Sequence, residues 1–553
     1  MSWEIKKRLR EIAGEEEGSY RKDPGGRINI CLVYPNTYYL GMSNLGFTGM
    51  YAFLNAKDDV FCERAFASLM SQSAGDAQVA VYSVETQRRV RTFDLVGFSV
   101  SFENDYLNVV RILQAEKIPT LRTERGQESP LIFCGGFAPH LNPEVLAQIC
   151  DFIVIGDGEP PMEQVIALLR ESPPSKRDFL ESLATIAGIY VPSLYEPGYD
   201  SEGAFVGFRG DFKEVEPAVS DLNRYPAHTK VFTRKTEFGD MFLVEIARGC
   251  VKKCFFCGVS HSPYGFRCLD KEIIKELIGW GLEYRKRVGL VGSAVLDHPD
   301  FLEIAGFVLD RGGAVSPASI RADMVSEEVA DILGRSGLKT AALAPETGDE
   351  RRRLKVGKGI RNDQFFEASL LLYQKGIANI KLYFVAGLPG SQEEEDVHDT
   401  VHFVKKLNHH IRSSRKKKSG PRIIVSMAGF VPKGMTPFQF APFPGVERLR
   451  STYRKMKKAL GREKWVKFES DVPKYSYLQA LLSTGDRRVS RALAAWDGVS
   501  DVLSHFRRSP VNPDYFAMRD KSLEETLPWD GIYASYGKEN LWQRYRKFIA
   551  PQP

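Results

Sequence analysis

Short apolar runs alternate with amphipathic stretches in the first third of the chain. The apolar runs predict strands at Ile28–Tyr34, Val79–Ser83, Asp94–Val100, Pro130–Cys134 and Phe152–Ile155. The stretches between them predict helices at Ser43–Leu54, Asn104–Glu116, Pro143–Ile149 and Pro160–Arg170. Strands that alternate with helices form a parallel sheet covered on both faces. We therefore expect an α/β, doubly wound (Rossmann- or flavodoxin-like) domain over residues 1–171.

Glycine-rich or polar turns follow these predicted strands. They are Pro35–Gly41, Ser99–Glu103, Gly135–His140 and Gly156–Glu159. Doubly wound sheets bind ligands outside the carboxyl ends of their strands, and glycine lets a backbone approach a ligand closely. The same residues also suit plain strand–helix connections. A ligand site and simple tight turns therefore both stay open.

The alternation resumes near residue 241, after a turn-rich linker over 172–240 with a short strand at Gly188–Val191. Strands are predicted at Met241–Ile246, Val288–Val291, Ala318–Ile320, Thr340–Leu343, Ile380–Val385 and Ile423–Met427. Helices are predicted at Lys271–Tyr284, Asp300–Leu309, Ser326–Ser336, Asn362–Lys375 and Gln392–Leu407. Six strand–helix units predict a partial (β/α)6 barrel over 241–440, with its site at the carboxyl ends of the strands.

Residues 441–553 show helical patterning joined by polar turns. Helices are predicted at Gly445–Leu460, Leu478–Ser483, Arg488–Trp496 and Leu541–Ile549. We expect a helical C-terminal region that says little about a substrate.

Cys250, Cys254 and Cys257 form a CxxxCxxC triplet directly after the first predicted barrel strand. Iron–sulfur clusters are held by cysteine thiolates, usually four of them. A triplet without a fourth partner at matching spacing leaves one iron of a [4Fe–4S] cube open. Structural zinc sites take four ligands, and His261 and Cys268 lie close enough in sequence to complete one. The position after a barrel strand favours the cluster over zinc.

Composition bounds the setting of this chemistry. The 553 residues carry 76 basic and 70 acidic side chains, a net charge of +6 that does not argue for nucleic-acid binding. The basic run Arg412–Arg422 has the composition of a solvated loop, with contact to RNA phosphates as the alternative. No apolar run approaches the ~20 residues of a membrane span, and the mixed-charge start is no signal peptide. Eight cysteines in this length do not suggest disulfides, so we expect a cytoplasmic protein with reduced thiols.

The triplet spacing, with Phe256 just before the last cysteine, resembles the cluster loop of the radical S-adenosylmethionine (SAM) enzymes. In that family the open iron chelates the amino and carboxylate groups of SAM, and an electron splits SAM to methionine and a 5′-deoxyadenosyl radical. The resemblance implies that the chain is an enzyme, that Cys250, Cys254 and Cys257 hold the metal, and that Phe256 lies against the adenine.

The resemblance also implies SAM contacts at the ends of the later strands. Gly292 stands where relatives carry Gly-Gly-Glu, but this sequence lacks the Glu. Arg321 is expected to pair with the carboxylate of SAM, with a surface arginine as the alternative. Glu346 is expected to accept from the ribose hydroxyls, with a helix cap as the alternative. The remaining implied contacts are Ser319 and Gly387. Lys381 is a further candidate because a charge inside a barrel strand is unusual unless it is paired or faces the site.

The N-terminal region resembles the cobalamin-binding domain that precedes many radical SAM domains. The segments 134–144 and 151–161 carry this resemblance. The turn Pro35–Gly41 lacks the histidine that coordinates cobalt in some cobalamin enzymes, so histidine-ligated cobalamin is not expected. Cobalamin bound in another way, and a relic domain used for substrate or packing, both stay open. The segment Leu481–Arg488 resembles the tail of a largely uncharacterised bacterial group, and the match covers roughly residues 28–500.

Three functional hypotheses follow. The first is a radical SAM enzyme that transfers a methyl group through cobalamin. The second is a cobalamin-independent radical SAM enzyme that performs a rearrangement, a cyclisation or an RNA modification. The third is a non-enzymatic iron–sulfur or zinc protein. The expected partners are an unspecified small-molecule or peptide substrate and a flavodoxin- or ferredoxin-type electron donor, which Arg248, Lys252 and Lys253 could dock; no membrane is expected.

Overall fold

The computed structural model describes residues 3–69, 80–171, 174–210, 213–262, 264–414, 420–532 and 537–550. The chain forms two compact units. The first comprises Met1–Gly239, Leu481–Phe516 and Leu523–Tyr533, and the second comprises Asp240–Ala480, Ala517–Ser522 and Ala534–Pro553. The C-terminal segments are therefore shared between the two units. None of the helices in the described ranges combines the length and the apolar character that a bilayer crossing requires.

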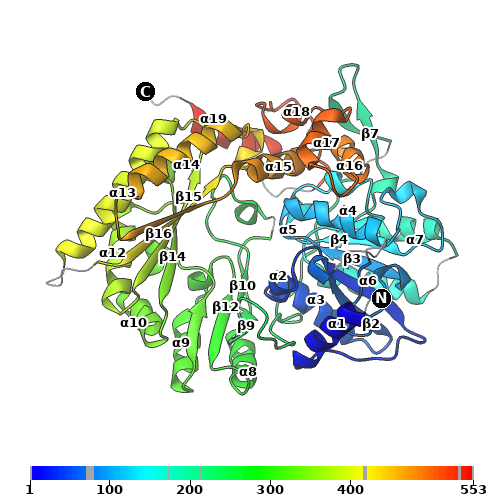
Figure 1. Cartoon of the computed structure of the whole chain (residues 1–553), viewed down its shortest axis with the longest axis horizontal. Helices are drawn as coiled ribbons and strands as arrows, with labels where there is room; N and C mark the ends of the chain where they lie inside the picture. The colour runs from blue at the N-terminus through cyan, green and yellow to red at the C-terminus, as the bar shows by residue number, and fades with distance from the viewer. Residues whose placement is uncertain are drawn as a thin grey trace. The chain divides into compact units, whose positions relative to one another are not determined.

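The first unit is built on a six-stranded sheet in the order β2-β1-β3-β4-β5-β6 (Figure 1). The strands are β1 (Ile28–Tyr34), β2 (Val60–Phe66), β3 (Leu95–Ser99), β4 (Leu131–Gly135), β5 (Phe152–Val154) and β6 (Ile189–Tyr190). The first five run parallel, and β6 pairs antiparallel with β5. The order 2-1-3-4-5 is that of flavodoxin-like doubly wound sheets, so the predicted fold class is confirmed.

Helices cover both faces of this sheet. On one face, α1 (Trp3–Glu15), α3 (Leu45–Asn55), α6 (Glu159–Arg170) and α7 (Lys176–Leu183) share one apolar core with β1. Phe133 of β4 belongs to that core. The next residue, Cys134, points to the opposite face, where Tyr106 of α4 (Tyr106–Ala115) is near enough to interact with it. The C-terminal helix α16 (Arg487–Ala494) packs against α4.

The sequence misplaced one strand of this unit. A strand was predicted at Val79–Ser83, but Val79 lies outside the described residues, and Tyr82 makes only an isolated bridge with Arg89. The second strand is β2, whose central Glu63 and Arg64 break the apolar pattern. Both are fully buried, because Glu63 pairs with Arg88 at 2.7 Å and Arg64 pairs with Glu16 at 2.6 Å. Because these buried charges interrupt the apolar pattern, the hydrophobicity of the sequence does not indicate the strand.

Other short elements also differ from expectation. The predicted helix Pro143–Ile149 is a single 3-10 turn at Glu144–Leu146. The region 172–240 contains α7 and a hairpin of β7 (Glu196–Tyr199) and β8 (Phe205–Arg209) besides the expected short strand. The remaining helices assigned to this unit are α2 (Tyr38–Met42), α5 (Phe137–Leu141) and α17 (Val502–Arg508).

A buried ion pair ties the C-terminal segment of the first unit to its sheet. Arg487 donates to both carboxylate oxygens of Glu144 at 2.9 Å, and their side chains are 5% and 2% exposed. The amide of Asn142 donates to the carbonyls of Ser483 and Gly485. The distinctive segment Leu481–Arg488 therefore has a structural role in holding the unit together.

Replacing Arg487 by Ala should destabilise the first unit strongly. The change leaves the buried Glu144 carboxylate without its cation, which typically costs about 3–5 kcal/mol. Calorimetry of the whole chain should show one unfolding transition at a clearly lower temperature. Arg491→Ala, an exposed position on the same helix, is the control and should leave all transitions in place. Equal behaviour of the two variants would contradict the prediction.

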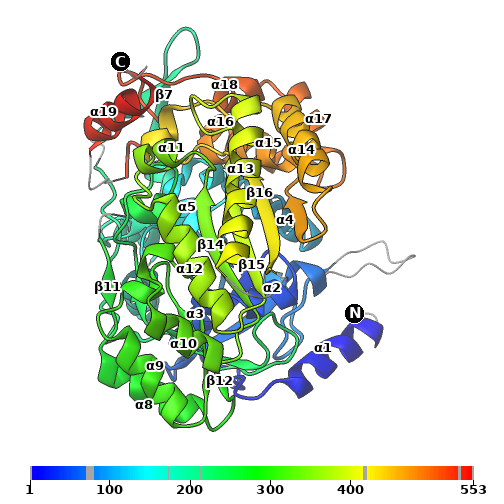
Figure 2. The ribbon, with the colours of Figure 1, turned by 90° about the vertical axis from the view of Figure 1, so that its left-hand side faces the viewer.

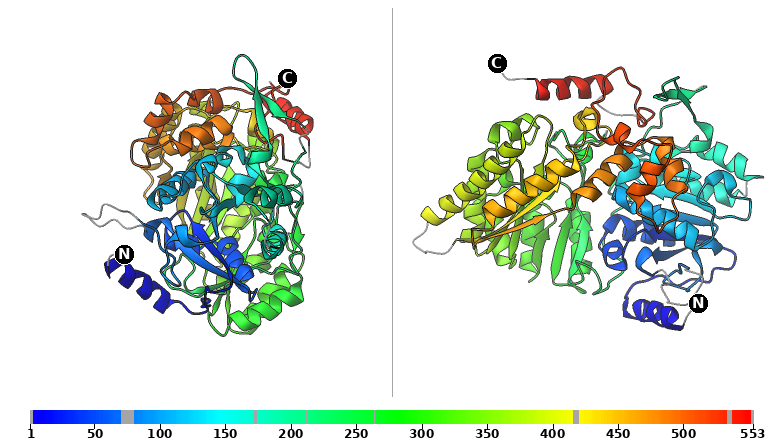
Figure 3. Two further views of the ribbon diagram at one scale, coloured as in Figure 1. Left: turned by 90° about the vertical axis from the view of Figure 1, so that its right-hand side faces the viewer. Right: turned by 45° about the horizontal axis from the view of Figure 1, so that its top comes forward.

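The second unit consists of parallel strands and their covering helices. One sheet contains β9 (Met241–Glu245), β12 (Arg287–Val291) and β13 (Ala314–Pro317), and the other contains β14 (Thr340–Glu346), β15 (Asn379–Ala386), β16 (Arg422–Gly429) and β17 (Val466–Ser470). All their pairings are parallel. Their helices are α8 (Lys271–Gly281), α9 (Phe301–Asp310), α10 (Glu327–Arg335), α12 (Asn362–Gln374), α13 (Glu393–Ser413) and α14 (Val446–Leu460). In Figure 2, α12 and α13 lie in front of β14 to β16, and the right-hand view of Figure 3 shows the green to yellow helices on the outer side of the strands of this unit.

Two features of this unit correct the sequence prediction. The third strand is Ala314–Pro317, and the predicted Ala318–Ile320 forms the turn after it. Gly312, Gly313 and Pro317 give this strand the composition of a loop. A seventh parallel strand, β17, follows the six expected ones and pairs with β16. The shorter elements are β10 (Ala247–Arg248), β11 (Arg267–Cys268), α11 (Glu350–Lys355) and α19 (Lys538–Ile549). α15 (Pro473–Thr484) begins in this unit and ends in the first, and α18 (Pro513–Ala517) belongs to the first unit up to Phe516.

Candidate functional site

The cysteine triplet lies in a loop at the carboxyl end of β9. We call residues 249–262 the cysteine loop. The loop doubles back at its start, where Ala247 and Arg248 pair antiparallel with Arg267 and Cys268. Gly249 has φ +87°, and a Cβ there would lie 2.0 Å from the carbonyl oxygen of Gly265. Only glycine fits this close return, which brings the triplet to the carboxyl edge of the strands.

The three thiols differ in burial. Cys254 is 5% exposed, whereas Cys250 and Cys257 are partly exposed. Burial raises the pKa of Cys254 to about 12, although the nearby Lys358 cation opposes the shift. A free thiol here is therefore protonated. Metal coordination is the event that would deprotonate it, as it does for ligating thiols in general.

The three cysteines are the type of ligand that an iron–sulfur cluster needs, but their side chains do not form a ready-made metal site. Among the residues that the structure describes, no group of three or more His, Cys, Asp or Glu side chains is arranged to hold a metal ion. In a [4Fe–4S] cube each thiolate ligates a different iron, so three cysteines surround a cube and need not converge on one atom. Cys250, Cys254 and Cys257 are the residues that would hold it, and this assignment stays a prediction.

A second loop, residues 356–359, packs against the cysteine loop. Phe255 donates its amide to the carbonyl of Val356 at 2.9 Å, and the sulfur of Cys254 lies 3.9 Å from the carbonyl oxygen of Gly357. Gly357 has φ +81°, and a Cβ there would lie 2.4 Å from the carbonyl oxygen of Lys253. The backbone of this loop, residues 356–359, thus lies directly against the metal-binding candidate.

Lys358 in this loop is a site residue that the sequence reasoning missed. Its ammonium lies 2.8 Å from Glu346, and the two side chains are 15% and 11% exposed. Burial lowers the pKa of Lys358, but the carboxylate of Glu346 and the thiolate forms of Cys254 and Cys257 outweigh it, so its pKa is raised. The flanking Gly357 and Gly359, both with positive φ, were the available signal in the sequence.

Glu346 itself sits on a distorted strand end. The pairing of β14 with β15 shifts between Leu343 and Glu346, and Glu346 has φ +65°. Left-handed backbone at a residue that is not glycine costs energy and often marks a functional site. The distortion places the carboxylate beside Lys358. The predicted contact of Glu346 with ribose hydroxyls would have to share this carboxylate with Lys358.

Arg321 lies in a network of charges after β13. Its guanidinium donates to Asp297 and, at 2.6 Å, to Asp323, and Lys252 of the cysteine loop pairs with Asp323 at 3.0 Å. Burial lowers the pKa of Arg321, but the two carboxylates outweigh it and hold the pKa above its ordinary value. Arg321 is therefore already paired with carboxylates, and a ligand carboxylate would have to displace one of them.

Ser319 and Gly292 are brought together. The hydroxyl of Ser319 lies 3.2 Å from the carbonyl oxygens of Gly292 and Ser293. A Cβ on Gly292 would lie 2.8 Å from the carbonyl oxygen of Ala247, so Gly292 also touches β10, just before the cysteine loop. Both residues lie just after the carboxyl ends of neighbouring strands, and their contacts with S-adenosylmethionine stay a prediction.

The three remaining sequence candidates are placed differently. Gly387 ends β15, has φ +73°, and donates its amide to Asp396 at 2.9 Å. Lys381 lies near the start of the same strand, five residues before Ala386, which is about 16 Å from the carboxyl edge at the usual rise. Its ammonium packs 4.9 Å from the ring of Tyr383. Phe256 is partly exposed on the cysteine loop. Lys381 is thus the one candidate that the fold does not bring to the edge.

Of the two alternative zinc ligands, His261 is engaged in other contacts through its ring. Nδ1 of His261 lies 3.0 Å from the carbonyl oxygen of Cys257, so it must carry the hydrogen, and Nε2 then accepts from Arg544 at 3.2 Å. Burial lowers the pKa of His261 to about 4. Cys268 lies in β11, and its backbone pairs with that of Ala247 in β10. His261 therefore presents no free ring nitrogen to a metal in this arrangement.

The basic residues of the loop are also paired. Arg248 bonds to Glu245 at 2.7 Å, Lys252 pairs with Asp323, and Lys253 donates to the carbonyl of Ser260 at 3.3 Å. In the structure, these contacts stabilise the conformation of the cysteine loop and of the residue just before it.

Comparison with known proteins assigns two segments of the chain. Residues 46–192 match the family model described as radical SAM proteins, N-terminal, and residues 244–404 match that of the radical SAM superfamily. The chain is a radical SAM superfamily protein. The second match begins within β9 and contains the cysteine triplet.

Relatives of this radical SAM protein span most of its length. An uncharacterized protein of Methanocaldococcus jannaschii, MJ0966, is 25% identical over 504 residues, which are 90% of this chain and 98% of the relative. The cobalamin-dependent S-adenosylmethionine radical enzyme OxsB with aqua-cobalamin bound superposes with a TM-score of 0.53 at 14% identity, over 95% of this chain and 79% of that one. Its complex with aqua-cobalamin and S-adenosylmethionine gives a TM-score of 0.51 at 15% identity, over 94% and 79%. These structural likenesses establish the fold.

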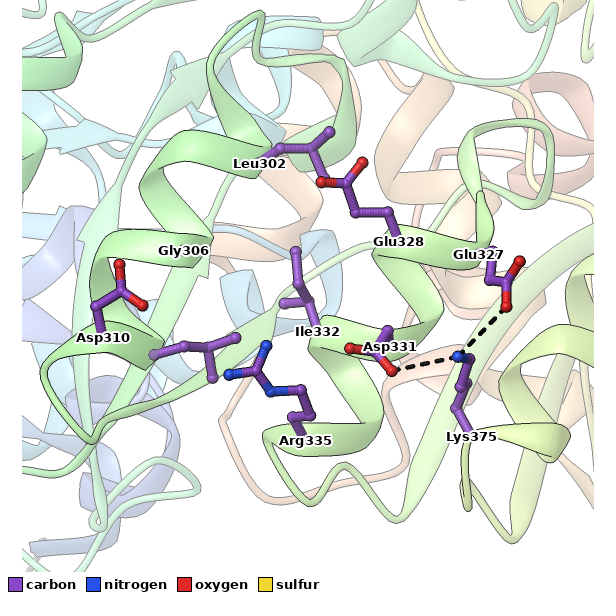
Figure 4. A pocket seen from close by; sticks show the side chains of 10 residues that line it. Leu302, Gly306, Asp310, Glu327, Glu328, Asp331, Ile332, Arg335 and Lys375 are labelled. Atoms are coloured by element: carbon purple, nitrogen blue, oxygen red, sulfur yellow. Dashed lines mark hydrogen bonds and ion pairs between the residues drawn. The ribbon is translucent and has the colours of Figure 1, made fainter.

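A separate pocket lies on the helical side of the radical SAM domain (Figure 4). It measures about 510 Å³ and is lined by residues of α9 and α10 together with Lys375, which pairs with Asp331 at 3.2 Å and Glu327 at 3.6 Å. Helices form this pocket, and the cysteine loop contributes no residue to it. It is therefore not part of the candidate site.

Replacing Lys358 by Met should destabilise the second unit even without a metal. The change removes the cation from the nearly buried Glu346 carboxylate, which costs about 3 kcal/mol. The double variant Lys358→Met/Glu346→Gln should recover most of this loss because no charge is then left unpaired. Urea unfolding of the metal-free protein measures both effects. Lys375→Met, which breaks an exposed pair, should cost under about 1 kcal/mol. A double variant as unstable as the sum of the single ones would contradict the coupling.

Proposed function

We propose that this protein is an enzyme that cleaves S-adenosylmethionine reductively with a [4Fe–4S] cluster on Cys250, Cys254 and Cys257. The observation that carries the proposal is the position of the triplet. It follows β9 at the carboxyl edge of the parallel strands, with Cys254 buried against the loop of residues 356–359 and near the cation Lys358. The cluster, when bound, would supply the electron that produces the 5′-deoxyadenosyl radical.

The residues of the chain prepare this position in three ways. Lys358 offsets the negative charge of the Cys254 and Cys257 thiolates in a place that is poorly solvated, where a nearby charge acts strongly. Gly357 lets the second loop approach without a side chain between them. Phe255 packs edge-on against Phe438 at 5.8 Å and Phe548 at 6.1 Å, which shields one side of the cysteine loop from water.

Replacing Cys250, Cys254 and Cys257 together by Ala should abolish cluster assembly and SAM cleavage. Anaerobic reconstitution with iron and sulfide, followed by iron analysis, measures the first effect. Formation of 5′-deoxyadenosine under dithionite measures the second. Cys268→Ala is the matched control and should keep about four irons per chain and full cleavage. A triple variant that still cleaves SAM reductively would refute the proposal.

We further propose that the first unit binds cobalamin and that the reaction is a methyl transfer through it. Exposed apolar side chains gather at the carboxyl ends of its strands, the usual ligand edge of such a sheet. Tyr39 and Leu40 follow β1, Phe102 follows β3 and Phe137 follows β4, and they are 43%, 46%, 45% and 38% exposed. Apolar groups left open together at one edge are typical of a binding surface, and a flat macrocycle fits it.

The turn after β1 indicates how the cobalt would be bound. The amide of Asn36 donates to Asp105 at 2.7 Å, and the hydroxyl of Tyr38 donates to Glu16 at 2.6 Å. These polar groups of the turn are engaged within the protein, and the turn contains no histidine. No residue of this turn would therefore coordinate the cobalt of a cobalamin bound here. The cobalamin-dependent enzyme with the same fold, OxsB, supports the proposal by analogy.

Reconstitution with hydroxocobalamin should leave close to one cobalamin per chain after gel filtration, measured from its absorption. Phe102→Asp should reduce this amount about tenfold because it introduces a charge into the apolar edge. Val206→Asp, an exposed apolar position on β8 of the same unit, should not. If the wild-type protein retains no cobalamin but still cleaves SAM, the cobalamin-independent radical reaction takes precedence. A flavodoxin- or ferredoxin-type donor remains the expected reductant in both cases.

A further inference from the structure

The last helix of the chain lies against the cysteine loop. Phe548 of α19 packs against Phe255 at 6.1 Å and against Phe438 at 4.9 Å, and Trp542 packs against Phe440 at 4.9 Å. Phe438 and Phe440 belong to the 3-10 turn that follows β16. The helix thus rests on two segments that leave carboxyl ends of strands. More than 270 residues separate it from the triplet along the sequence.

Arg544 of α19 makes three contacts with the cysteine loop at once. Its guanidinium donates to the carbonyl of Lys253 at 3.1 Å and to Nε2 of His261 at 3.2 Å, and it stacks 4.5 Å from the ring of Phe255. Lys253 and Phe255 flank Cys254 in sequence. His261 in turn donates to the carbonyl of Cys257 at 3.0 Å. One side chain therefore reaches both of the last two cysteines through their immediate neighbours.

We propose that Arg544 is a positioning residue, and that α19 acts through it as a brace that holds Cys254 and Cys257 in the geometry a cluster needs. The inference rests on the proposed cluster site, but the brace itself is a property of the protein without metal. An arginine suits this task because its planar fork makes two directed hydrogen bonds while its face stacks on an aromatic ring. A lysine at the same place offers one charge and no fork.

The physical need for a brace follows from the loop itself. The cysteine loop contains only one short 3-10 turn, Gly258–His261, and short turns open easily by themselves. The amides of Cys257 and Ser260 bond to the carbonyls of Cys254 and Cys257, both at 3.1 Å. Opening of these bonds would separate the ligands before a cluster can form. Contacts from a packed helix raise the free energy of that opening.

Hydrogen exchange of the metal-free protein tests the brace directly. Arg544→Ala should speed exchange of the Cys257 and Ser260 amides about tenfold, the effect of losing hydrogen bonds from a charged donor. Lys547→Ala, at an exposed position on the same helix, should leave both rates within a factor of two. Arg544→Lys should resemble Arg544→Ala because the fork is lost. Exchange in Arg544→Ala within a factor of two of wild type would overturn the proposal.

A double-mutant cycle and a cluster measurement complete the test. His261→Ala combined with Arg544→Ala should speed exchange less than the product of the two single effects, because both act on one connection; an effect equal to the product would count against the connection. In reconstituted protein, Arg544→Ala should release iron to a chelator about tenfold faster than wild type and Lys547→Ala, and equal release rates would overturn the role in holding the cluster. A wild-type protein that assembles no cluster, with the exchange effects intact, would reject the proposed function and leave the brace standing.

Discussion

The ion pair between Lys358 and Glu346 is the interaction on which the candidate site depends most. Both groups are nearly buried, and a lone charge at either position would be costly, so each requires the other. The pair links the bulged end of β14 to the loop of residues 356–359. That loop in turn makes backbone contact with Phe255 and lies beside Cys254. A strained strand end, a glycine-flanked lysine and the buried cysteine are therefore parts of one arrangement.

The C-terminal segments have a different role in each unit. In the first unit, Arg487 completes a buried ion pair that stabilises the fold and takes no part in the candidate site. In the second, α19 places Arg544 against the backbone of the cysteine loop. Both contacts use arginine, whose fork satisfies two acceptors from a single side chain. Residues distant in sequence thus supply the cations that the packed interior and the loop need.

The sequence predicted the doubly wound sheet and the parallel strands of the second unit because their apolar runs are clear. It failed for β2, where Glu63 and Arg64 sit inside a fully buried strand, and for the third strand of the second unit, where Pro317 and two glycines suggested a loop. Motif spacing located the cysteine triplet after β9. Lys358 and Arg544 could not be found in this way, since their roles depend on contacts between distant segments and neither belongs to a periodic pattern. A site role was predicted for Lys381 because a charge inside a strand is unusual, but Lys381 lies near the amino end of β15, away from the candidate site.

Four cations around the cysteine loop are already paired with carboxylates before any ligand binds. Arg321 is paired with Asp297 and Asp323, Lys252 with Asp323, Arg248 with Glu245 and Lys358 with Glu346. A zwitterionic ligand such as S-adenosylmethionine would therefore exchange ion pairs rather than fill unpaired ones. The net gain from such an exchange is small, because each new contact replaces an existing one. Most of the affinity must then come from contacts that the protein alone cannot make. Direct coordination to an open iron of the proposed cluster on Cys250, Cys254 and Cys257 would be a contact that no internal side chain can replace.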